Sequence, residues 1–316
     1  MRLIKINARL IGPKIPVSKS DPVGANRRLS KALKETRSRY STIKSSVIDL
    51  FKAIPVSAIN TQDAYGYRYD FSSARAANFI DELQLLIDRI LLDSTQPMNA
   101  GQFWMSIEVA GAYSAGTVEA QQQLALMSPI YAEERSITDI IYSEPYIKRL
   151  SIANISTYSD WKGISDAARN DLTQVMMNGI ATGANPREIE KEISQRVEVS
   201  QSRAENIAQT ELTGILRKAN RDEVQESKTL LGINSALFWI SALLQTTRLS
   251  HAMRSGQAFS PEDCEAFYAV DGNRYRCHCS QTPCMLDDEG NVIMLESSLE
   301  RVTAARDKWL SAHKAK

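Results

Sequence analysis

The chain has 316 residues, a hydrophobic share of 43%, a charged share of 24% and a formal net charge of +1. These values are typical of a globular protein with enough chain for a large core, and they exclude a polycation that coats nucleic acid with its whole surface. Four cysteines in this length argue against a small secreted domain held by disulfides. Because the N-terminus lacks the apolar region of a signal peptide and no segment has the roughly eighteen unbroken apolar residues of a membrane span, we expect a soluble protein made in the cytoplasm, with no membrane partner.

The first predicted element is a long helix from about Asn26 to Ile54, which follows Asp21-Pro22 and ends before Pro55. Its core-type positions alternate between spacings of four and three, which is the pattern of a helix that packs lengthwise against a partner helix. These positions are Leu29, Leu33, Thr36, Tyr40, Ile43, Val47, Leu50 and Ile54.

The same helix has a strongly basic face, with Glu35 as the single acid between residues 27 and 44. One interpretation is a solvated face. The other is a docking face for double-stranded DNA or for an acidic partner. The basic residues are Arg27, Arg28, Lys31, Lys34, Arg37, Arg39 and Lys44.

Helices continue to predominate up to about residue 230. After a loop or short extended segment at 56–72, the patterns predict helices at 73–92, 101–126, 165–179, 187–197 and from about 200 or 202 to 227, with interruptions at Pro129 and Pro145. Small residues at 110–116 suit a close approach between two helices. Since no segment here is convincingly a strand, the sequence predicts an N-terminal arm (1–20) followed by an all-helical body (21–230).

Residues 231–316 differ in character and predict a small α+β module. Residues 237–244 form an apolar run typical of a strand or buried segment, and residues 246–256 predict a short helix with a threonine cap and Gly256 as its stop. Ser260-Pro261 begins another short helix, residues 284–295 have the pattern of a β-hairpin, and a last helix covers about 296–312. The predicted fold class is therefore mainly α, an extended helical body with a small C-terminal α+β module that contains a β-hairpin.

Three of the four cysteines lie within NRYRCHCSQTPC, residues 273–284. A tetrahedral zinc site needs four Cys or His ligands, and His251 with Cys277, Cys279 and Cys284 is a conceivable set. The spacings C-x-C and C-x4-C are not those of a standard zinc knuckle, and a disulfide or a turn held by packing are the alternatives. We prefer the packed turn, which needs no cofactor, and we expect Cys264 to be a small buried apolar residue.

Catalysis by this module is the less favoured interpretation. Arg248, His251 and Arg254 can share one helix face, so that His251 could act as a general base while the arginines hold an anion. No nucleophile or carboxylate lies at a motif spacing from this histidine, and the chain has no phosphate-binding glycine motif and no H-E-x-x-H. We therefore expect no catalytic residues and no enzyme, with a metal-dependent hydrolase or nuclease, or an ADP-ribosyltransferase-like enzyme, as the alternative.

Five further segments are DPVGANRRLSKALKETRSRYSTIKSSV (21–47), NGIATGANPREIEKEI (178–193), RAENIAQTELTGILRKAN (203–220), WISALLQTTRLSHAMRSGQAF (239–259) and GNRYRCHCS (272–280). In this order, they resemble the head-morphogenesis or minor head proteins of tailed bacteriophages, the group that includes the Mu F-like proteins. Gln209 departs from the family pattern, which usually has arginine there. The resemblance covers about 20–60 and 165–290.

Two groups of residues carry the family's pattern. The resemblance gives the C-terminal group structural or metal-binding roles rather than catalytic ones. The helix motif consists of Arg203, Ala204, Ile207, Ala208, Thr210 and Glu211, and the C-terminal group of Trp239, Thr247, Arg248, His251, Arg254, Asn273, Cys277 and Cys279.

The resemblance implies a minor capsid protein of the virion that is made in the host cytoplasm and placed inside the phage head near the portal vertex. Its implied partners are the portal protein and the major capsid or scaffolding protein, with packaged double-stranded DNA as a further partner. The implied role is virus assembly at the procapsid stage, together with DNA packaging or delivery. A DNA-binding packaging factor that uses the basic helix is a second alternative.

Overall fold

The computed structural model describes residues 12–61, 64–93 and 103–314. The chain is mainly helical with two small antiparallel sheets, and the predicted mainly α fold with a small C-terminal α+β module is confirmed. Contacts divide the chain into unit 1 (Met1–Arg28, Val109–Ser151 and Thr210–Lys316) and unit 2 (Leu29–Glu108 and Ile152–Gln209). Both units combine segments that are distant in sequence, and the predicted linear division at residues 20 and 230 stays a prediction.

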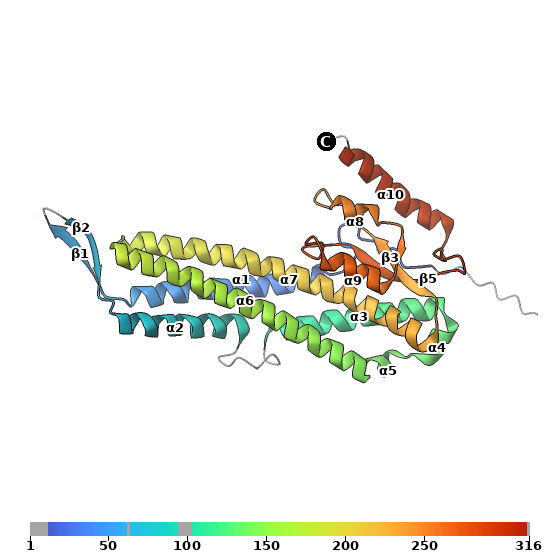
Figure 1. Cartoon of the computed structure of the whole chain (residues 1–316), viewed down its shortest axis with the longest axis horizontal. Coiled ribbons are helices and arrows are strands. Elements are labelled where there is room, and N and C mark those ends of the chain that lie inside the picture. Colours follow the sequence, from blue (N-terminus) through green and yellow to red (C-terminus); the bar gives the residue numbers. More distant parts are fainter. Residues whose placement is uncertain (1–11, 62–63, 94–102, 315–316) are drawn as a thin grey trace, which may run out of the picture. The chain divides into compact units, whose positions relative to one another are not determined.

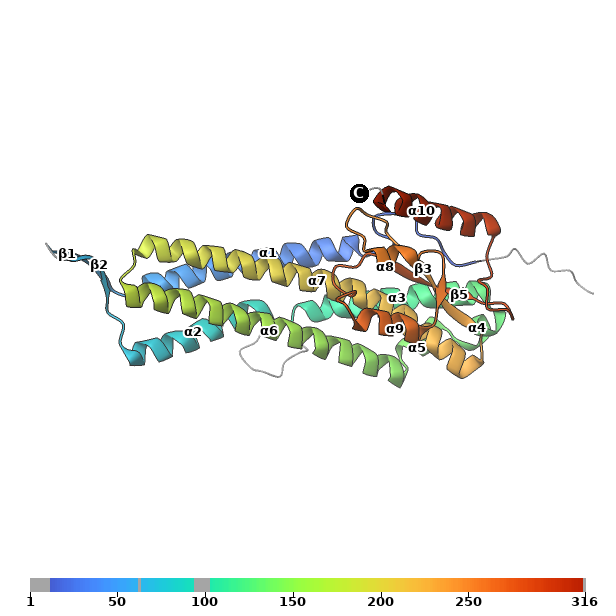
Figure 2. The same ribbon diagram turned by 45° about the horizontal axis from the view of Figure 1, so that its top comes forward.

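Four helices contribute to the packing of unit 2 and run side by side in both views (Figures 1 and 2). They are α1 (Asn26–Lys52), α2 (Ser73–Leu92), α6 (Glu144–Thr182) and α7 (Pro186–Leu231), of which α1, α6 and α7 extend into the residues of unit 1. The Tyr40 hydroxyl of α1 lies 2.9 Å from Ser200 Oγ of α7, and Lys162 of α6 donates to the carboxylate of Asp88 of α2. Direct polar contacts therefore join these helices in pairs.

The buried stripe of α1 differs from the predicted one at Leu33 and Leu50, and the predicted Ile54 lies beyond the end of the helix at Lys52. Leu33 and Leu50 are only half-buried, while Ala32 and Phe51 are buried instead. The buried positions thus repeat at spacings of three, four and four, which keeps one face of a straight helix turned to the core, whereas a strict heptad requires supercoiling. The stripe is Leu29, Ala32, Thr36, Tyr40, Ile43, Val47 and Phe51.

An antiparallel hairpin follows α1, so the prediction of an all-helical body is wrong here, while the alternative of a short extended segment is confirmed. Strand β1 (Val56–Thr61) pairs with β2 (Ala64–Tyr69) in a register that sets Val56 opposite Tyr69. β-branched and aromatic residues favour strands. The hairpin is anchored to the end of α6 because Tyr67 N donates to Gly183 O at 3.1 Å.

Helices α6 and α7 are both longer than the sequence patterns predict. Helix α6 begins at Glu144, because Pro145 occupies its first turn, where the missing amide hydrogen costs nothing. The predicted break near residues 197–200 is wrong. The Ser194 hydroxyl donates to Glu190 O and the Ser202 hydroxyl to Glu198 O, so these serines satisfy their polar groups within α7 and need no cap.

Unit 1 contains a close contact between two helices at Gly116, as the small residues at 110–116 predict. A methyl group added to Gly116 of α3 (Met105–Met127) would lie 2.6 Å from Leu216 O and 2.8 Å from Ala219 Cβ of α7. The predicted start of α3 at Gly101 lies outside the described residues. Short helices α4 (Pro129–Glu134) and α5 (Ile137–Ile141) follow α3.

A three-stranded sheet organises the C-terminal part of unit 1 (Figure 1). Strand β3 (Ser235–Ile240) is central and pairs antiparallel with β4 (Ala258–Phe259) and β5 (Ser280–Met285). All of β3 is buried: Leu237 and Trp239 pack into one core cluster, and Ala236, Phe238 and Ile240 into another. The predicted strand is thus confirmed as far as Ile240, after which the chain leaves the sheet and Leu243 takes a positive φ of 50°.

Three helices complete the module: α8 (Leu249–Met253), α9 (Pro261–Ala269) and α10 (Glu296–Lys314). The predicted cap of α9 is confirmed as a capping box of Ser260 and Asp263. The predicted threonine cap of α8 is wrong, since Arg248 is its N-cap residue and the Thr247 hydroxyl accepts from Leu244 N instead.

Of the hairpin predicted at 284–295, the structure has one isolated antiparallel bridge, between Leu286 and Val292. Cys284 and Met285, at the start of the predicted hairpin, belong to β5 and pair with β3 instead. Among the helices of the described residues, none has the length and apolar character that crossing a bilayer requires.

Candidate functional site

His251 lies in the aromatic core on one side of the sheet in unit 1. Its side chain is 2% exposed, and its ring centroid lies 4.9 Å from that of Phe267 and 6.1 Å from that of Trp239. The short helix α8 places it there, since His251 and Ala252 are the buried residues of that helix. A histidine so enclosed has to satisfy both ring nitrogens with protein groups.

Both thiols of the C-x-C motif face this imidazole. Cys277 Sγ lies 3.4 Å from His251 Nδ1 and Cys279 Sγ lies 3.6 Å from it. The three ligand-type atoms lie within 4.8 Å of one another, and all three side chains are buried. The structure therefore brings three of the four predicted metal-site residues together.

The opposite edge of the imidazole is held by Asn273. The Asn273 Nδ2 group donates to Phe267 O at 3.0 Å, which leaves Oδ1 as the atom that faces His251 Nε2 at 3.3 Å. Arg248 Nη1, 3.5 Å from Nε2, has a backbone acceptor of its own in Asn273 O at 3.3 Å. In a neutral imidazole the proton then belongs on Nε2, and the lone pair of Nδ1 points to the two sulfurs.

The loop that carries the thiols is tied to α7. Arg276, which has a positive φ of 51°, donates its backbone N–H to Thr210 Oγ1 at 3.2 Å. Arg248 Nη2 donates to Tyr275 O at 3.0 Å on the other side of the loop. Thr210 belongs to the helix motif and Arg248 to the C-terminal group, so the loop connects the two parts of the resemblance.

Arg217 is a functional candidate that the sequence patterns did not identify. Its guanidinium is buried, donates to Cys277 O at 2.8 Å and to Cys279 O at 3.4 Å, and lies 4.7 Å from the ring centroid of Tyr268. The structure shows that Arg217, four residues after Thr213 and seven before Val224, lies on the buried face of α7 with both of them, and the sequence shows only this spacing.

The two thiols of the motif differ in acidity. Burial opposes ionisation of Cys277, but the hydrogen bond from Cys279 and the positive charge of Arg217 hold the pKa of the Cys277 thiol well below its ordinary value. The same hydrogen bond, together with burial, raises the pKa of the Cys279 thiol well above its ordinary value. The two shifts are opposite in direction, and Cys277 is the more acidic thiol of the pair.

Cys284 does not belong to this group, which corrects the predicted four-ligand set. It pairs with Ala236 in the sheet and faces the other core cluster with Phe238 and Val302, on the opposite side of the sheet from Cys277 and Cys279. Burial raises the pKa of the Cys284 thiol to about 12. All four cysteines are free thiols, so the disulfide interpretation is wrong as well.

Cys264 is fully buried, as predicted, and burial raises the pKa of its thiol to about 12. Arg254 places its guanidinium 4.1 Å from the Phe267 ring and 4.3 Å from the Phe259 ring, where it packs against the Trp239 side of the sheet. Thr247 is separate from the thiol group and fixes the backbone at Leu244.

The remaining residues of the helix motif have packing roles. Ala204 and Ala208 are fully buried, and Ile207 and Glu211 are half-buried. Arg203 is exposed, with a distant ion pair to Asp171 at 3.6 Å. Thr210 differs from them in that its hydroxyl oxygen accepts from Arg276 N in the loop of the C-x-C motif.

The basic face of α1 is largely neutralised by carboxylates. Arg37 makes two hydrogen bonds to Glu205, and the other ion pairs join Lys31 to Glu108, Arg39 to Glu35 and Asp93, and Lys44 to Glu198. Within the described residues, Arg27, Arg28 and Lys34 make no ion pair. The structure thus leaves three of the seven predicted DNA-contact or partner-contact residues without an acidic partner.

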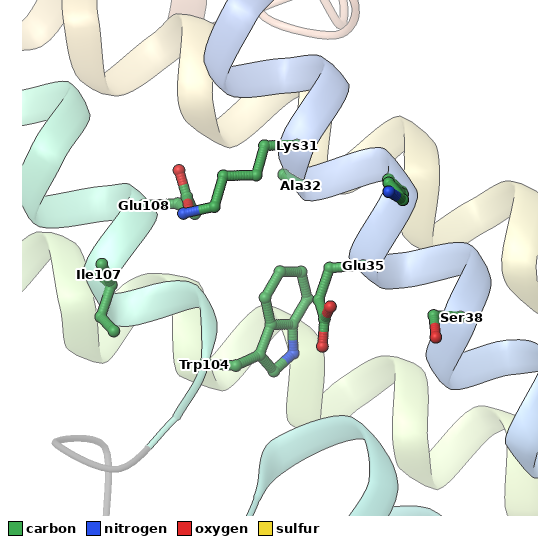
Figure 3. Close-up of a pocket in the computed structure, with 8 residues that line it drawn as sticks. Lys31, Ala32, Glu35, Ser38, Trp104, Ile107 and Glu108 are labelled. Atoms are coloured by element: carbon green, nitrogen blue, oxygen red, sulfur yellow. The ribbon is translucent and has the colours of Figure 1, made fainter.

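A surface pocket of about 360 Å³ lies beside this face, between α1 and the start of α3 (Figure 3). Lys31 points to Glu108 across it, and Glu35 lies next to the Trp104 ring. Since its charged groups are of both signs and already paired in part, the pocket has no clear preference for an anion or a cation.

Comparison with known families identifies the segment that holds this site. The family described as Phage Mu protein F like protein matches residues 170–282. No curated protein and no solved structure gives a match. The match includes α7, β3, His251, Arg217 and both cysteines of the C-x-C motif, but neither Cys284 nor the basic segment at 21–47, whose resemblance stays a prediction. Over residues 170–282, the chain is therefore similar to the Phage Mu protein F like family.

Proposed function

We propose that the protein is a minor structural protein of a tailed-phage head that acts in procapsid assembly at the portal vertex, where it contacts the portal protein and the major capsid or scaffolding protein. The observation that carries this proposal is the family match at 170–282, because that family suggests a role in phage head morphogenesis. DNA packaging or delivery would be a later step of the same assembly, and a position inside the head would allow contact with packaged DNA.

The character of the site supports a structural rather than an enzymatic role. His251, Cys277 and Cys279 are 2%, 3% and 2% exposed, so a substrate cannot reach them without local unfolding. Enzyme sites are usually concave and open to their substrates, whereas these side chains contact one another and the backbone. Their arrangement stabilises a loop against α7 and α8.

The proposal is tested in a phage that carries this gene. We expect mass spectrometry of purified procapsids and virions to detect the chain in fewer copies than the major capsid protein. Deletion of the gene should lower the yield of normal heads, and expression of the chain in trans should restore it. Absence of the chain from both particles would refute the proposal.

The position in the head needs a separate measurement. In intact virions, protease added from outside should leave the chain uncut, and it should be cut after the heads are opened. A photo-crosslinker on an exposed side chain such as Tyr142, which is 76% exposed, should capture the portal protein from procapsids. Crosslinks to the major capsid protein alone would place the chain in the shell and contradict the portal position.

A further inference from the structure

We propose that His251 Nδ1, Cys277 Sγ and Cys279 Sγ bind a thiophilic transition-metal ion, Zn²⁺ or a close analogue, which fastens the C-x-C loop to α8. This inference goes beyond the proposed head function and does not depend on it. It begins from the convergence of three ligand-type atoms from two separate chain segments within 4.8 Å. Thiolate sulfur and imidazole nitrogen are the donors that Zn²⁺ prefers.

The distances are those expected if the imidazole nitrogen and both sulfurs share one ion. Bonds of about 2.3 Å to sulfur and about 2.05 Å to nitrogen, at a tetrahedral angle, separate the two atoms by about 3.6 Å. The observed separations from His251 Nδ1 are 3.4 Å to Cys277 Sγ and 3.6 Å to Cys279 Sγ. A single lone pair can accept one S–H group well, whereas an ion placed between the three atoms serves both sulfurs equally.

The surroundings have the features that support a metal-bound histidine. A ligating imidazole usually donates its other N–H to an oxygen, which fixes its tautomer and orientation. Asn273 Oδ1 lies 3.3 Å from His251 Nε2, and the amide of Asn273 is itself fixed by its bond to Phe267 O. The backbone N–H of Cys279 donates to Cys277 Sγ at 3.4 Å, as expected of a thiolate ligand.

Charge and burial are consistent with a closed structural site. Two thiolates and a neutral imidazole balance a divalent ion, and the exposed fractions of 2–3% exclude solvent. Ser241 Oγ lies 3.5 Å from Cys279 Sγ, near enough to supply an oxygen for the fourth position. This set replaces Cys284 of the sequence prediction with a hydroxyl from the end of β3.

The test uses the full chain, purified, stripped with a chelator and then loaded with Zn²⁺ or Co²⁺. We expect about one ion per chain and, with Co²⁺, the near-ultraviolet sulfur-to-cobalt charge-transfer absorption of a thiolate site. His251→Ala, Cys277→Ser and Cys279→Ser should abolish both signals. Cys264→Ser and Cys284→Ser, which change equally buried thiols outside the group, should retain them.

A second variant separates metal binding from folding. Asn273→Ala removes the partner of His251 Nε2 and should weaken Zn²⁺ affinity about 10–100-fold, as measured by chelator competition. The proposal is overturned if wild-type protein, folded by circular dichroism, shows neither stoichiometric Zn²⁺ nor the sulfur-to-cobalt absorption. It is equally overturned if Cys284→Ser, in folded protein, loses the ion while Cys279→Ser keeps it. Should the ligand variants fail to fold, the cobalt spectrum of the wild type decides the matter alone.

Discussion

At the scale of the single residue, Arg217 joins α7 to the C-x-C loop through its charge. Its guanidinium is buried and makes no ion pair with a carboxylate of the described chain. Instead it donates to two carbonyl oxygens of the loop and lies over the Tyr268 ring. Burial of a charge is unfavourable unless hydrogen bonds and other polar contacts offset it, and the two carbonyl oxygens and the Tyr268 ring provide those contacts.

The first prediction is that Arg217→Met destabilises the protein by about 3 kcal/mol or more. Methionine keeps most of the volume of the side chain, but Cys277 O and Cys279 O lose their donor in a buried site. Urea unfolding followed by circular dichroism measures the change in the free energy of unfolding. Arg203→Met is the matched control on the same helix, since Arg203 is exposed and its loss should cost about 0.5 kcal/mol or less. Equal stability of the two variants would contradict the role given to Arg217.

At this scale the sequence identifies the residue types of the site but not their grouping. The short spacing of Cys277, Cys279 and Cys284 makes them equivalent as candidates. Strand pairing separates them, because Cys284 lies opposite Ala236 and so faces the other side of β3. Arg217 escapes prediction for the same reason, since its partners lie 60 and 62 residues further along the chain.

At the scale of the element, packing of α3 against α7 depends on the absence of a side chain at Gly116. The backbone of α7 approaches so closely that Leu216 O and Ala219 Cβ occupy the space of a methyl group. The sequence predicts this contact through its small residues, but it does not specify the partner helix. Likewise the pattern of α1 predicts a packed face but wrongly assigns Leu33 and Leu50 to it. A heptad spacing and the observed three-four-four spacing share most of their positions over the length of one helix, so the sequence alone does not distinguish them.

The second prediction is that Gly116→Ala and Gly214→Ala change stability in opposite directions. Alanine at Gly116 should cost about 1–3 kcal/mol through overpacking against α7. At Gly214, within α7, no atom lies within 4 Å of the added methyl group, so the higher helix propensity of alanine should stabilise by about 0.5–1 kcal/mol. Thermal unfolding of both variants, compared with wild type, measures the signs. A stabilising Gly116→Ala would show that the two helices can separate at no cost.

The third prediction concerns the salt dependence of any DNA binding by α1. Four of the seven basic residues are paired with carboxylates, which leaves Arg27, Arg28 and Lys34 for phosphate contacts. Three contacts give a slope of log K against log salt concentration of about −3, whereas seven would give about −6. Fluorescence anisotropy with a duplex over a range of salt concentrations measures the slope, and Lys34→Gln should reduce it by about 1. A slope near −6 would mean that the ion pairs of α1 open on DNA.

At the scale of the whole molecule, the family segment depends on residues outside it. The core cluster around Trp239 includes Leu124 and Tyr131, which precede residue 170. Buried Glu223, inside the segment, accepts from the Tyr131 hydroxyl at 2.5 Å and from Arg135 at 2.8 Å. A sequence motif marks where the recognisable residues lie, but the folding unit is set by contacts that the motif does not contain.

The fourth prediction follows from that dependence: a fragment of residues 170–282 does not fold by itself. Without α4, the carboxylate of Glu223 loses its donors and the Trp239 side of the sheet exposes apolar surface to water. The fragment should keep helical far-ultraviolet dichroism while it loses the near-ultraviolet signal of the packed Trp239 and lacks a cooperative thermal transition. The full chain, measured under the same conditions, is the positive control. Glu223→Ala in the full chain should reproduce part of the loss, about 3 kcal/mol in the free energy of unfolding, whereas the exposed neighbour change Glu134→Ala should leave it within about 0.5 kcal/mol. A fragment that melts cooperatively with a native near-ultraviolet spectrum would show that α4 merely lies on a module that is already complete.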